Sequence, residues 1–100
     1  MKIDVLYFEE CPNYLPAIDR LRAVLEQEGL RAEISEIAVR ETSVAKALRF
    51  FGSPTIRING LDIDVNSRTV TDTGLACRRY SDGLPSEEMI LAALREAREL

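Results

Sequence analysis

The segment Lys2-Ile3-Asp4-Val5-Leu6-Tyr7-Phe8-Glu9-Glu10-Cys11-Pro12 gives the clearest indication of how this chain folds. Residues 2–8 alternate in polarity and then become fully apolar, which is typical of a buried central strand. Cys11-Pro12 follows that strand and precedes a helical pattern. A thiol in this position lies among the unpaired N–H groups of a helix N-terminus, which favour the thiolate over the thiol. The segment therefore predicts a strand, a cysteine and a helix, in that order.

The first helical pattern runs from Asn13 to Glu28. We expect Asn13 to cap this helix, because Pro16 then lies in the first turn, where its missing N–H is not needed. Gly29 stands where a glycine commonly ends a helix. The apolar positions recur at helical spacing, and they are Leu15, Ile18, Leu21, Val24 and Leu25.

Two further helices are expected. A short helix begins with Thr42 or Ser43 as its cap and continues through Phe51. The last helix follows Pro85, with Ser86 as its N-cap. Its expected buried stripe consists of Met89, Ile90, Leu94 and Ala97.

Three more strands complete the pattern. Residues 30–39 and Thr55–Asn59 have the composition of strands, and the second of these follows Gly52-Ser53-Pro54. Asn59-Gly60 is a strong signal for a two-residue hairpin, so residues 61–65 should return antiparallel. The predicted order is β-α-β-α-β-β-α, an α/β fold with a four-stranded mixed sheet flanked by helices. We expect a single domain over residues 1–100, with an irregular insertion at 66–83 that carries Cys77.

Composition argues against several classes of function. The chain has 100 residues, a net charge of −4, two cysteines and no histidine. The negative charge argues against nucleic acid and against anionic membranes as partners. The sequence shows neither an apolar run of membrane-spanning length nor a signal peptide, which predicts a cytoplasmic protein. Without histidine there is no Ser-His or Cys-His nucleophile pair, and two cysteines fall short of a closed zinc site. We therefore predict no resident metal and no cofactor.

Two motifs, Tyr7-Phe8-Glu9-Glu10-Cys11-Pro12 and Ser53-Pro54-Thr55, resemble those of the thioredoxin-like superfamily. The resemblance implies a nucleophilic Cys11 and a cis Ser53–Pro54 peptide beside its sulfur. It also implies that the backbone of Ser53 pairs with a substrate chain. An alternative is that Pro54 only marks the start of an edge strand. Tyr14 stands in the place of the usual second cysteine, so no disulfide can form within the motif. Either the Tyr14 hydroxyl donates a hydrogen bond to the Cys11 sulfur, or Tyr14 is only a packed aromatic residue.

The segment Gly74-Leu75-Ala76-Cys77-Arg78-Arg79-Tyr80 carries a narrower resemblance, to short bacterial thioredoxin-like proteins of which some are labelled organomercurial (alkylmercury) lyase. The segment must fold back over the site if Cys77 is to resolve a mixed disulfide, since a disulfide needs Cα atoms within about 7 Å. Arg78 beside Cys77 favours its thiolate, whereas the two glutamates before Cys11 oppose ionisation there. The alternatives are a buried, inert Cys77 and a solvated turn at the arginines.

Three functions stay open at this point. In the first, Cys11 attacks a protein or small-molecule disulfide, and Cys77 or an external thiol completes the exchange. In the second, two close thiolates bind a soft metal such as mercury. In the third, the chain is a non-catalytic binding module of the same fold. The candidate catalytic residues are Cys11 and Cys77, and the candidate substrate-binding residues are Pro12, Tyr14, Ser53, Pro54, Thr55 and Arg78.

Overall fold

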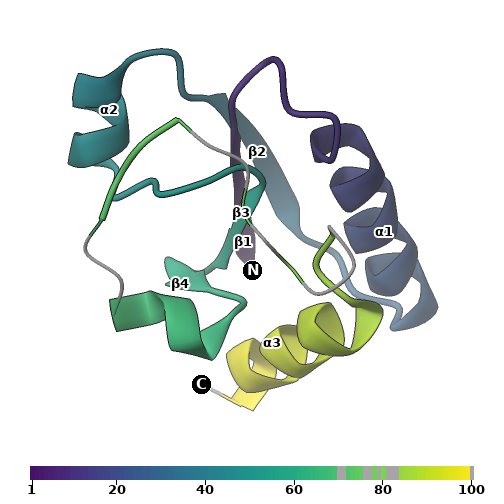
Figure 1. The fold of residues 1–100 in the computed structure, drawn as a ribbon. Coiled ribbons are helices and arrows are strands. Elements are labelled where there is room, and N and C mark those ends of the chain that lie inside the picture. The colour runs from purple at the N-terminus through teal and green to yellow at the C-terminus, as the bar shows by residue number, and fades with distance from the viewer. Residues whose placement is uncertain (70–71, 76–77, 79, 81–83, 100) are drawn as a thin grey trace.

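A four-stranded mixed sheet with the strand order β2-β1-β3-β4 forms the centre of the molecule (Figure 1). Its strands are β1 (Lys2–Tyr7), β2 (Glu33–Ala38), β3 (Thr55–Ile58) and β4 (Leu61–Asp62). β1 is parallel to β2 and antiparallel to β3, and β3 is antiparallel to β4. The prediction of an α/β chain with a four-stranded mixed sheet is therefore confirmed. This computed structural model describes residues 1–69, 72–75, 78, 80 and 84–99.

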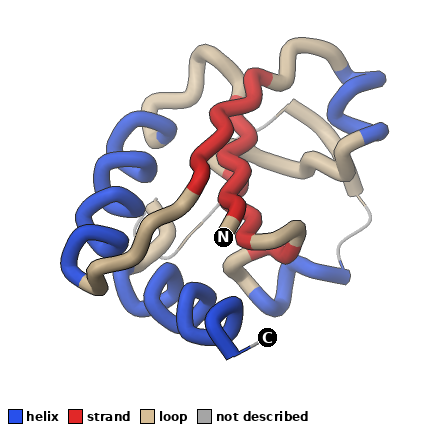
Figure 2. The backbone as a smooth tube through the Cα atoms, turned by 180° about the vertical axis from the view of Figure 1, so that it is seen from behind, coloured by secondary structure: helices blue, strands red, loops and turns tan. Residues whose placement is uncertain are grey.

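Helices lie on both faces of this sheet, as the views from the two sides show (Figure 2). They are α1 (Tyr14–Gln27), α2 (Thr42–Ala47) and α3 (Glu87–Glu99), together with the short 3-10 helix η1 (Val65–Thr69). None of the helices in the described ranges combines the length and the apolar character that crossing a bilayer requires.

The face of the sheet under α1 and α3 is apolar. Ile3 and Val5 of β1 stand opposite Ile58 and Ile56 of β3, and all four are buried. The α1 side chains Ile18, Leu21, Val24 and Leu25 pack against them, as do Ile90, Ala93 and Leu94 of α3. This is the main core, and it accounts for most of the hydrophobic stabilisation of the fold.

The opposite face combines a small apolar cluster with charged residues. Leu6 packs there with Val39, Ala45 and Phe50 beneath α2. Further along the same face, Asp4 of β1 stands opposite Arg57 of β3, and Arg57 stands opposite Asp62 of β4. Because side chains alternate between the faces of a strand, these three charges share one side of the sheet.

Several predicted details of the helices were wrong. Thr42 and Ser43 do not cap α2, because Glu41 is the N-cap residue and no side chain bonds there. α2 ends at Ala47 rather than near Phe51, since Arg49 adopts a positive φ of 55° and the Phe50 N–H donates to the Ala45 carbonyl. Leu15, expected in the buried stripe of α1, is 64% exposed. Within α3, Ala93 is buried, whereas Met89 and Ala97 are only partly so.

Other local predictions are confirmed. Asn13 is the N-cap residue of α1, although its side chain makes no capping hydrogen bond. Asn59 and Gly60 both have positive φ, which is the backbone geometry of the expected two-residue hairpin. The returning strand β4 is only two residues long, because the chain enters η1 soon afterwards. Ser86 caps α3, with its hydroxyl accepting the Met89 N–H at 3.0 Å.

Candidate functional site

Cys11 lies in the short loop between β1 and α1, where the sequence placed it. Its N–H donates to the carbonyl of Phe8 at 3.0 Å, which closes a tight turn at the end of the strand. The thiol is free, and the residue is buried, with 7% of its surface exposed. Pro12 beside it is exposed. The loop therefore presents Pro12 to solvent and shields most of the cysteine.

The second motif forms a buried loop immediately before β3. Ser53, Pro54 and Thr55 are all inaccessible, and the Ser53–Pro54 peptide is cis, as the resemblance implied. The Thr55 hydroxyl donates to the carbonyl of Gly52 at 2.5 Å. A hydroxyl that is satisfied in this way can be buried at little cost. Thr55 and Ser53 therefore belong to the framework of the loop.

Phe8 connects the two motifs. Its N–H donates to the Ser53 hydroxyl at 3.3 Å, while its carbonyl accepts the N–H of Cys11. The pairing of Leu6 in β1 with Thr55 in β3 brings the two loops to the same end of the sheet. Two hydrogen bonds through one residue thus link Cys11 to the Ser53–Pro54 loop.

Tyr14 is a packed aromatic residue, which is the second of the two alternatives. Its ring stacks on Tyr7, with centroids 3.6 Å apart and planes within 2°. Its hydroxyl donates to the carboxylate of Glu36 on β2 rather than to the Cys11 sulfur. Burial raises the pKa of Tyr14, and the hydrogen bond to Glu36 raises it further. Tyr14 therefore ties the first turn of α1 to the edge of the sheet.

The described residues of the 72–80 segment return to the Ser53–Pro54 loop. The Gly74 N–H donates to the Phe50 carbonyl at 3.0 Å, and the Arg78 N–H donates to the Ser53 carbonyl at 2.8 Å. The Tyr80 hydroxyl donates to the carbonyl of Pro54 at 2.8 Å. The Ser53 backbone, which the resemblance assigns to a substrate chain, thus has its carbonyl bonded within the molecule. Cys77 lies outside the described residues.

Arg78 is the most tightly held charged side chain of this region. Its guanidinium donates to the Asp62 carboxylate at 2.8 Å and to the Ser67 hydroxyl at 2.9 Å. It also lies 4.5 Å from the ring centroid of Phe51 and 4.6 Å from that of Tyr80, within range of cation–π attraction. The alternative of a solvated turn is wrong for Arg78, because the residue is buried.

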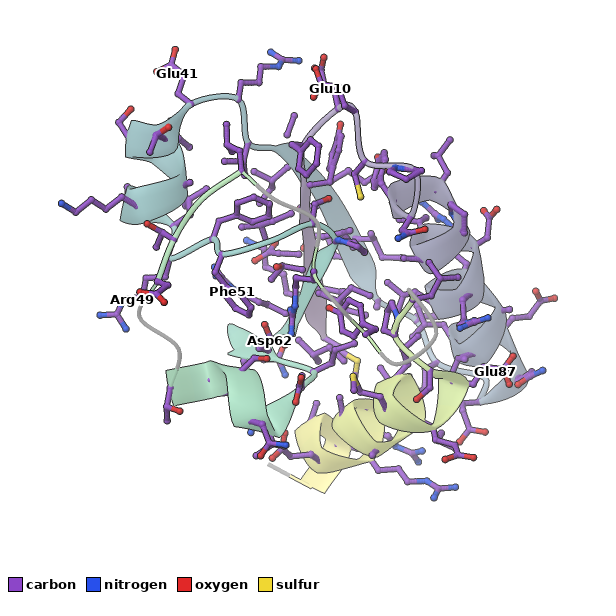
Figure 3. All side chains as sticks on the ribbon, in the orientation of Figure 1. Glu10, Glu41, Arg49, Phe51, Asp62 and Glu87 are labelled. Carbon is purple, nitrogen blue, oxygen red and sulfur yellow. The ribbon has the colours of Figure 1, made fainter. Side chains whose placement is uncertain are left out.

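Asp62, the ion-pair partner of Arg78, is the residue of this region that sequence reasoning missed. It is buried, it lies on the same side of the molecule as Phe51 (Figure 3), and it neutralises the charge of Arg78. Its partner is 16 residues away in sequence, so no local signal could have found it.

A pocket of about 340 Å³ flanks the loop that precedes Cys11. Phe8, Val39 and Leu75 supply apolar walls, and Glu10 forms part of its charged rim. The remaining charges, Glu9 and Arg40, form an ion pair at 2.6 Å. The pocket is large enough for a small apolar group and lies next to the cysteine loop.

The described residues contain no group of three histidine, cysteine, aspartate or glutamate side chains close enough to share a metal ion. The soft-metal hypothesis depends on Cys77 and stays a prediction. Comparisons of the chain with known family models, curated proteins and solved structures found no match.

Proposed function

We propose that the chain is a thioredoxin-like thiol–disulfide oxidoreductase in which Cys11 is the nucleophile. The observation that carries this proposal is the connection between the two motifs through Phe8, whose N–H and carbonyl bond to Ser53 and Cys11. The free thiol of Cys11, in the loop before α1, is thereby held at the same end of the sheet as the Ser53–Pro54 loop. The strand order β2-β1-β3-β4 is compatible with such a fold.

The proposed reaction transfers two electrons to the substrate. The Cys11 thiolate attacks one sulfur of a disulfide, so that a new bond forms to Cys11 and the other sulfur leaves as a thiolate. A second thiolate then attacks the Cys11 sulfur of the mixed disulfide and releases the remaining substrate sulfur as a thiolate. If Cys77 is this second thiol, the chain ends with a Cys11–Cys77 disulfide. If an external thiol such as glutathione is the second thiol, Cys11 ends in a mixed disulfide with glutathione. A second glutathione thiolate then attacks the glutathione sulfur of that bond, which restores the Cys11 thiolate and forms glutathione disulfide.

The neighbouring residues have distinct proposed tasks. Pro12 is exposed beside Cys11 and meets the incoming disulfide. Ser53 and Thr55 hold the loop through their hydroxyl groups, and Pro54 forms its buried wall. Support for Cys77 as the resolving thiol comes from its sequence neighbours: Gly74 and Arg78 donate hydrogen bonds to Phe50 and Ser53. Tyr14 acts only through the position of α1.

Because Cys11 is buried, the test uses a small disulfide as substrate. A thiol with 7% exposure reacts with small disulfides far faster than with bulky ones, because the substrate sulfur must reach it. The reduced protein is mixed with hydroxyethyl disulfide, and the products are followed by mass spectrometry. We expect Cys11→Ser to abolish the reaction and Cys77→Ser to accumulate the mixed disulfide on Cys11. Thermal unfolding of each variant provides the control for folding.

A second candidate is the non-catalytic binding module. Two observations favour it: the cysteine is buried, and the Ser53 carbonyl already accepts the Arg78 N–H. In that case the wild-type protein reduces no disulfide, and Cys11→Ser changes neither its reactivity nor its fold. A Cys11→Ala variant that unfolds as the wild type does, together with an inert wild-type thiol, would overturn the oxidoreductase proposal.

A further inference from the structure

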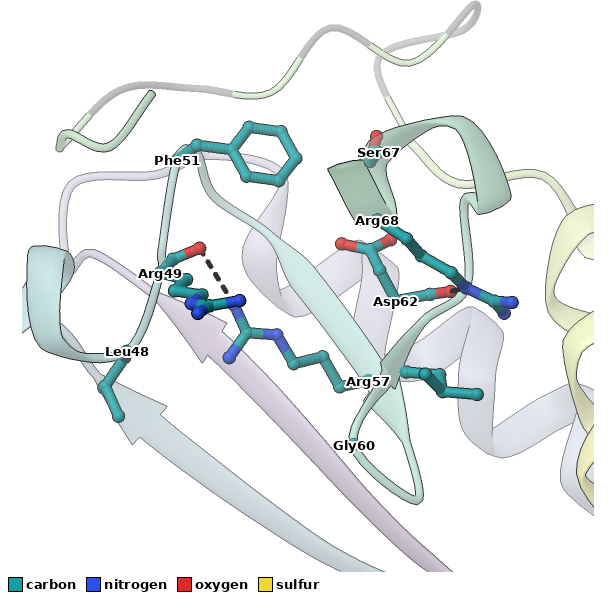
Figure 4. Close-up of a pocket in the computed structure, with 9 residues that line it drawn as sticks. Leu48, Arg49, Phe51, Arg57, Gly60, Asp62, Ser67 and Arg68 are labelled. Carbon is teal, nitrogen blue, oxygen red and sulfur yellow. Dashed lines mark hydrogen bonds between the residues drawn. The ribbon is translucent and has the colours of Figure 1, made fainter. Parts of the chain in front are cut away.

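A second pocket, of about 270 Å³, opens on the charged face of the sheet (Figure 4). It lies between the end of α2, the β3–β4 hairpin and η1, and it shares no lining residue with the Cys11 and Ser53–Pro54 loops. Three arginines line it: Arg49, Arg57 and Arg68. Nothing in the proposed thiol chemistry uses these residues.

The charges around the pocket are unequally balanced. Arg68 is paired with Glu96 at 2.6 Å, and Arg78, behind the pocket, is paired with Asp62 at 2.8 Å. Within the described part of the chain, no carboxylate oxygen lies within 4 Å of the guanidinium of either Arg49 or Arg57. The wall carboxylate of Asp62 is already engaged, since one oxygen accepts from Arg78 and the other from the Asp64 N–H. Two cations therefore lack a close counter-charge.

Arg57 is the better placed of these two cations. Its side chain extends across the pocket, where one terminal N–H donates to the Arg49 carbonyl at 3.0 Å (Figure 4). No fully buried side-chain nitrogen or oxygen of the described residues lacks a hydrogen-bond partner, so the remaining N–H groups of the half-buried Arg57 keep some contact with solvent. They are free to donate to a ligand.

The electrostatic environment of Arg57 is consistent with this arrangement. Burial has the largest effect and lowers the pKa of Arg57. The charges of Asp62 and Asp4 raise this pKa and act more strongly than those of Arg78 and Arg49, which lower it, but the combined result is still a lowered pKa. A bound anion that contacted both Arg57 and Arg49 would offset the repulsion between these two cations.

We propose that this pocket binds a small oxyanion, a phosphate or carboxylate group, through the guanidinium of Arg57, with Arg49 contributing a second positive charge. The planar guanidinium matches two oxygens of such a group and can donate to both. Leu48, Phe51 and Leu61 line the same pocket and provide apolar contacts for a body attached to the oxyanion. The site is independent of thiol exchange, so either proposal can fail alone.

Titration of the ¹⁵N-labelled protein with sodium phosphate, acetate or benzoate, at constant ionic strength set by chloride, tests the proposal. We expect the side-chain Nε–Hε resonance of Arg57 to shift saturably with at least one of these anions. Stronger binding of phosphate assigns a phosphoryl ligand, whereas stronger binding of benzoate than of acetate assigns a carboxylate on an apolar body.

Three variants sharpen this test. Arg57→Lys keeps the charge and loses the paired donors, so binding should weaken at least about tenfold. Arg49 lies on the exposed rim, so Arg49→Gln should weaken binding about two- to fivefold with no effect on folding. Arg31→Gln removes the same charge from an exposed position far from the pocket lining and should leave binding unchanged. The proposal is overturned if no anion shifts the Arg57 resonance saturably, or if Arg49→Gln and Arg31→Gln weaken binding equally.

Discussion

The guanidinium of Arg78 lies 2.8 Å from the carboxylate of Asp62, and both side chains are at least 93% buried, with exposures of 4% and 7%. This pair joins β4 to the segment that covers the Ser53–Pro54 loop. A buried ion pair contributes little net stability when it is intact, but the loss of one partner leaves the other charge buried and unpaired. The pair therefore makes the position of this segment sensitive to single substitutions.

Arg78→Met should lower the free energy of unfolding by about 3–5 kcal/mol, because the Asp62 carboxylate loses the cation that compensates its burial. Urea unfolding followed by circular dichroism measures the change. Arg95→Met is the matched control, since Arg95 is exposed on α3 and its loss should change stability by less than about 0.5 kcal/mol. Equal effects of the two substitutions would show that the buried pair has no special role.

Gly52→Ala should also destabilise the fold. A Cβ at this position would lie 2.5 Å from Cγ and 3.2 Å from the backbone N of Arg78, so the segment would have to shift. We expect a loss of about 1–3 kcal/mol, the usual cost of overpacking. At Gly74 a Cβ would meet nothing within 4 Å, which makes Gly74→Ala the control. A loss no larger than that of the control would argue against close contact between Gly52 and Arg78.

Ser86→Ala should cost about 1 kcal/mol, because its hydroxyl accepts the Met89 N–H at the start of α3. Ser43→Ala is the informative comparison. Ser43 lies inside α2, and no side chain caps that helix, so its replacement should have little effect. Thermal unfolding of both variants measures the difference, and the cap assignment would be wrong if Ser43→Ala proved the more damaging.

Tyr80 predicts a loss of stability in alkaline solution. Burial raises the pKa of Tyr80, and the nearby carboxylates Asp62 and Asp64 raise it further, while the charge of Arg78 acts in the opposite direction. The unfolded chain releases this proton near pH ~10, whereas the folded chain keeps it to a higher pH. The contribution is thus complete below pH ~10 and decreases as the pH rises toward the folded pKa.

Tyr80→Phe isolates this contribution from the other groups that titrate at high pH. The variant should lose about 1 kcal/mol near neutral pH, because the hydrogen bond to the Pro54 carbonyl is gone. Above pH ~10 its free energy of unfolding should fall less steeply with pH than that of the wild type. Urea unfolding at a series of pH values measures both slopes, and identical slopes would contradict the assignment.

The parts of the fold that the sequence predicted correctly depend on local signals. The apolar run of β1 and the helical pattern after Asn13 lie directly on either side of Cys11, so its place between strand and helix follows from neighbouring residues. Asn59-Gly60 set the hairpin because both residues tolerate positive φ. Ser86 was identified as a cap because its hydroxyl acts within one turn.

What the sequence could not show depends on distant partners. Tyr14 bonds to Glu36, 22 residues away on β2, and Arg78 bonds to Asp62, 16 residues away. Neither partner has a local pattern that marks it. The end of α2 was misplaced for a different reason: Arg49, not a glycine, takes the left-handed conformation there, so the usual stop signal is absent.

The central position of β1 affects how the protein is made. β1 is synthesised before the other three strands, yet its two edges are completed only when β2 and then β3 have been made. The apolar face of β1 is covered by α3 only after α3 has been synthesised, at least 80 residues later. The nascent chain therefore carries β1 with one edge unpaired until β3 is made and with part of its apolar face uncovered until α3 is made, which exposes it to aggregation during synthesis.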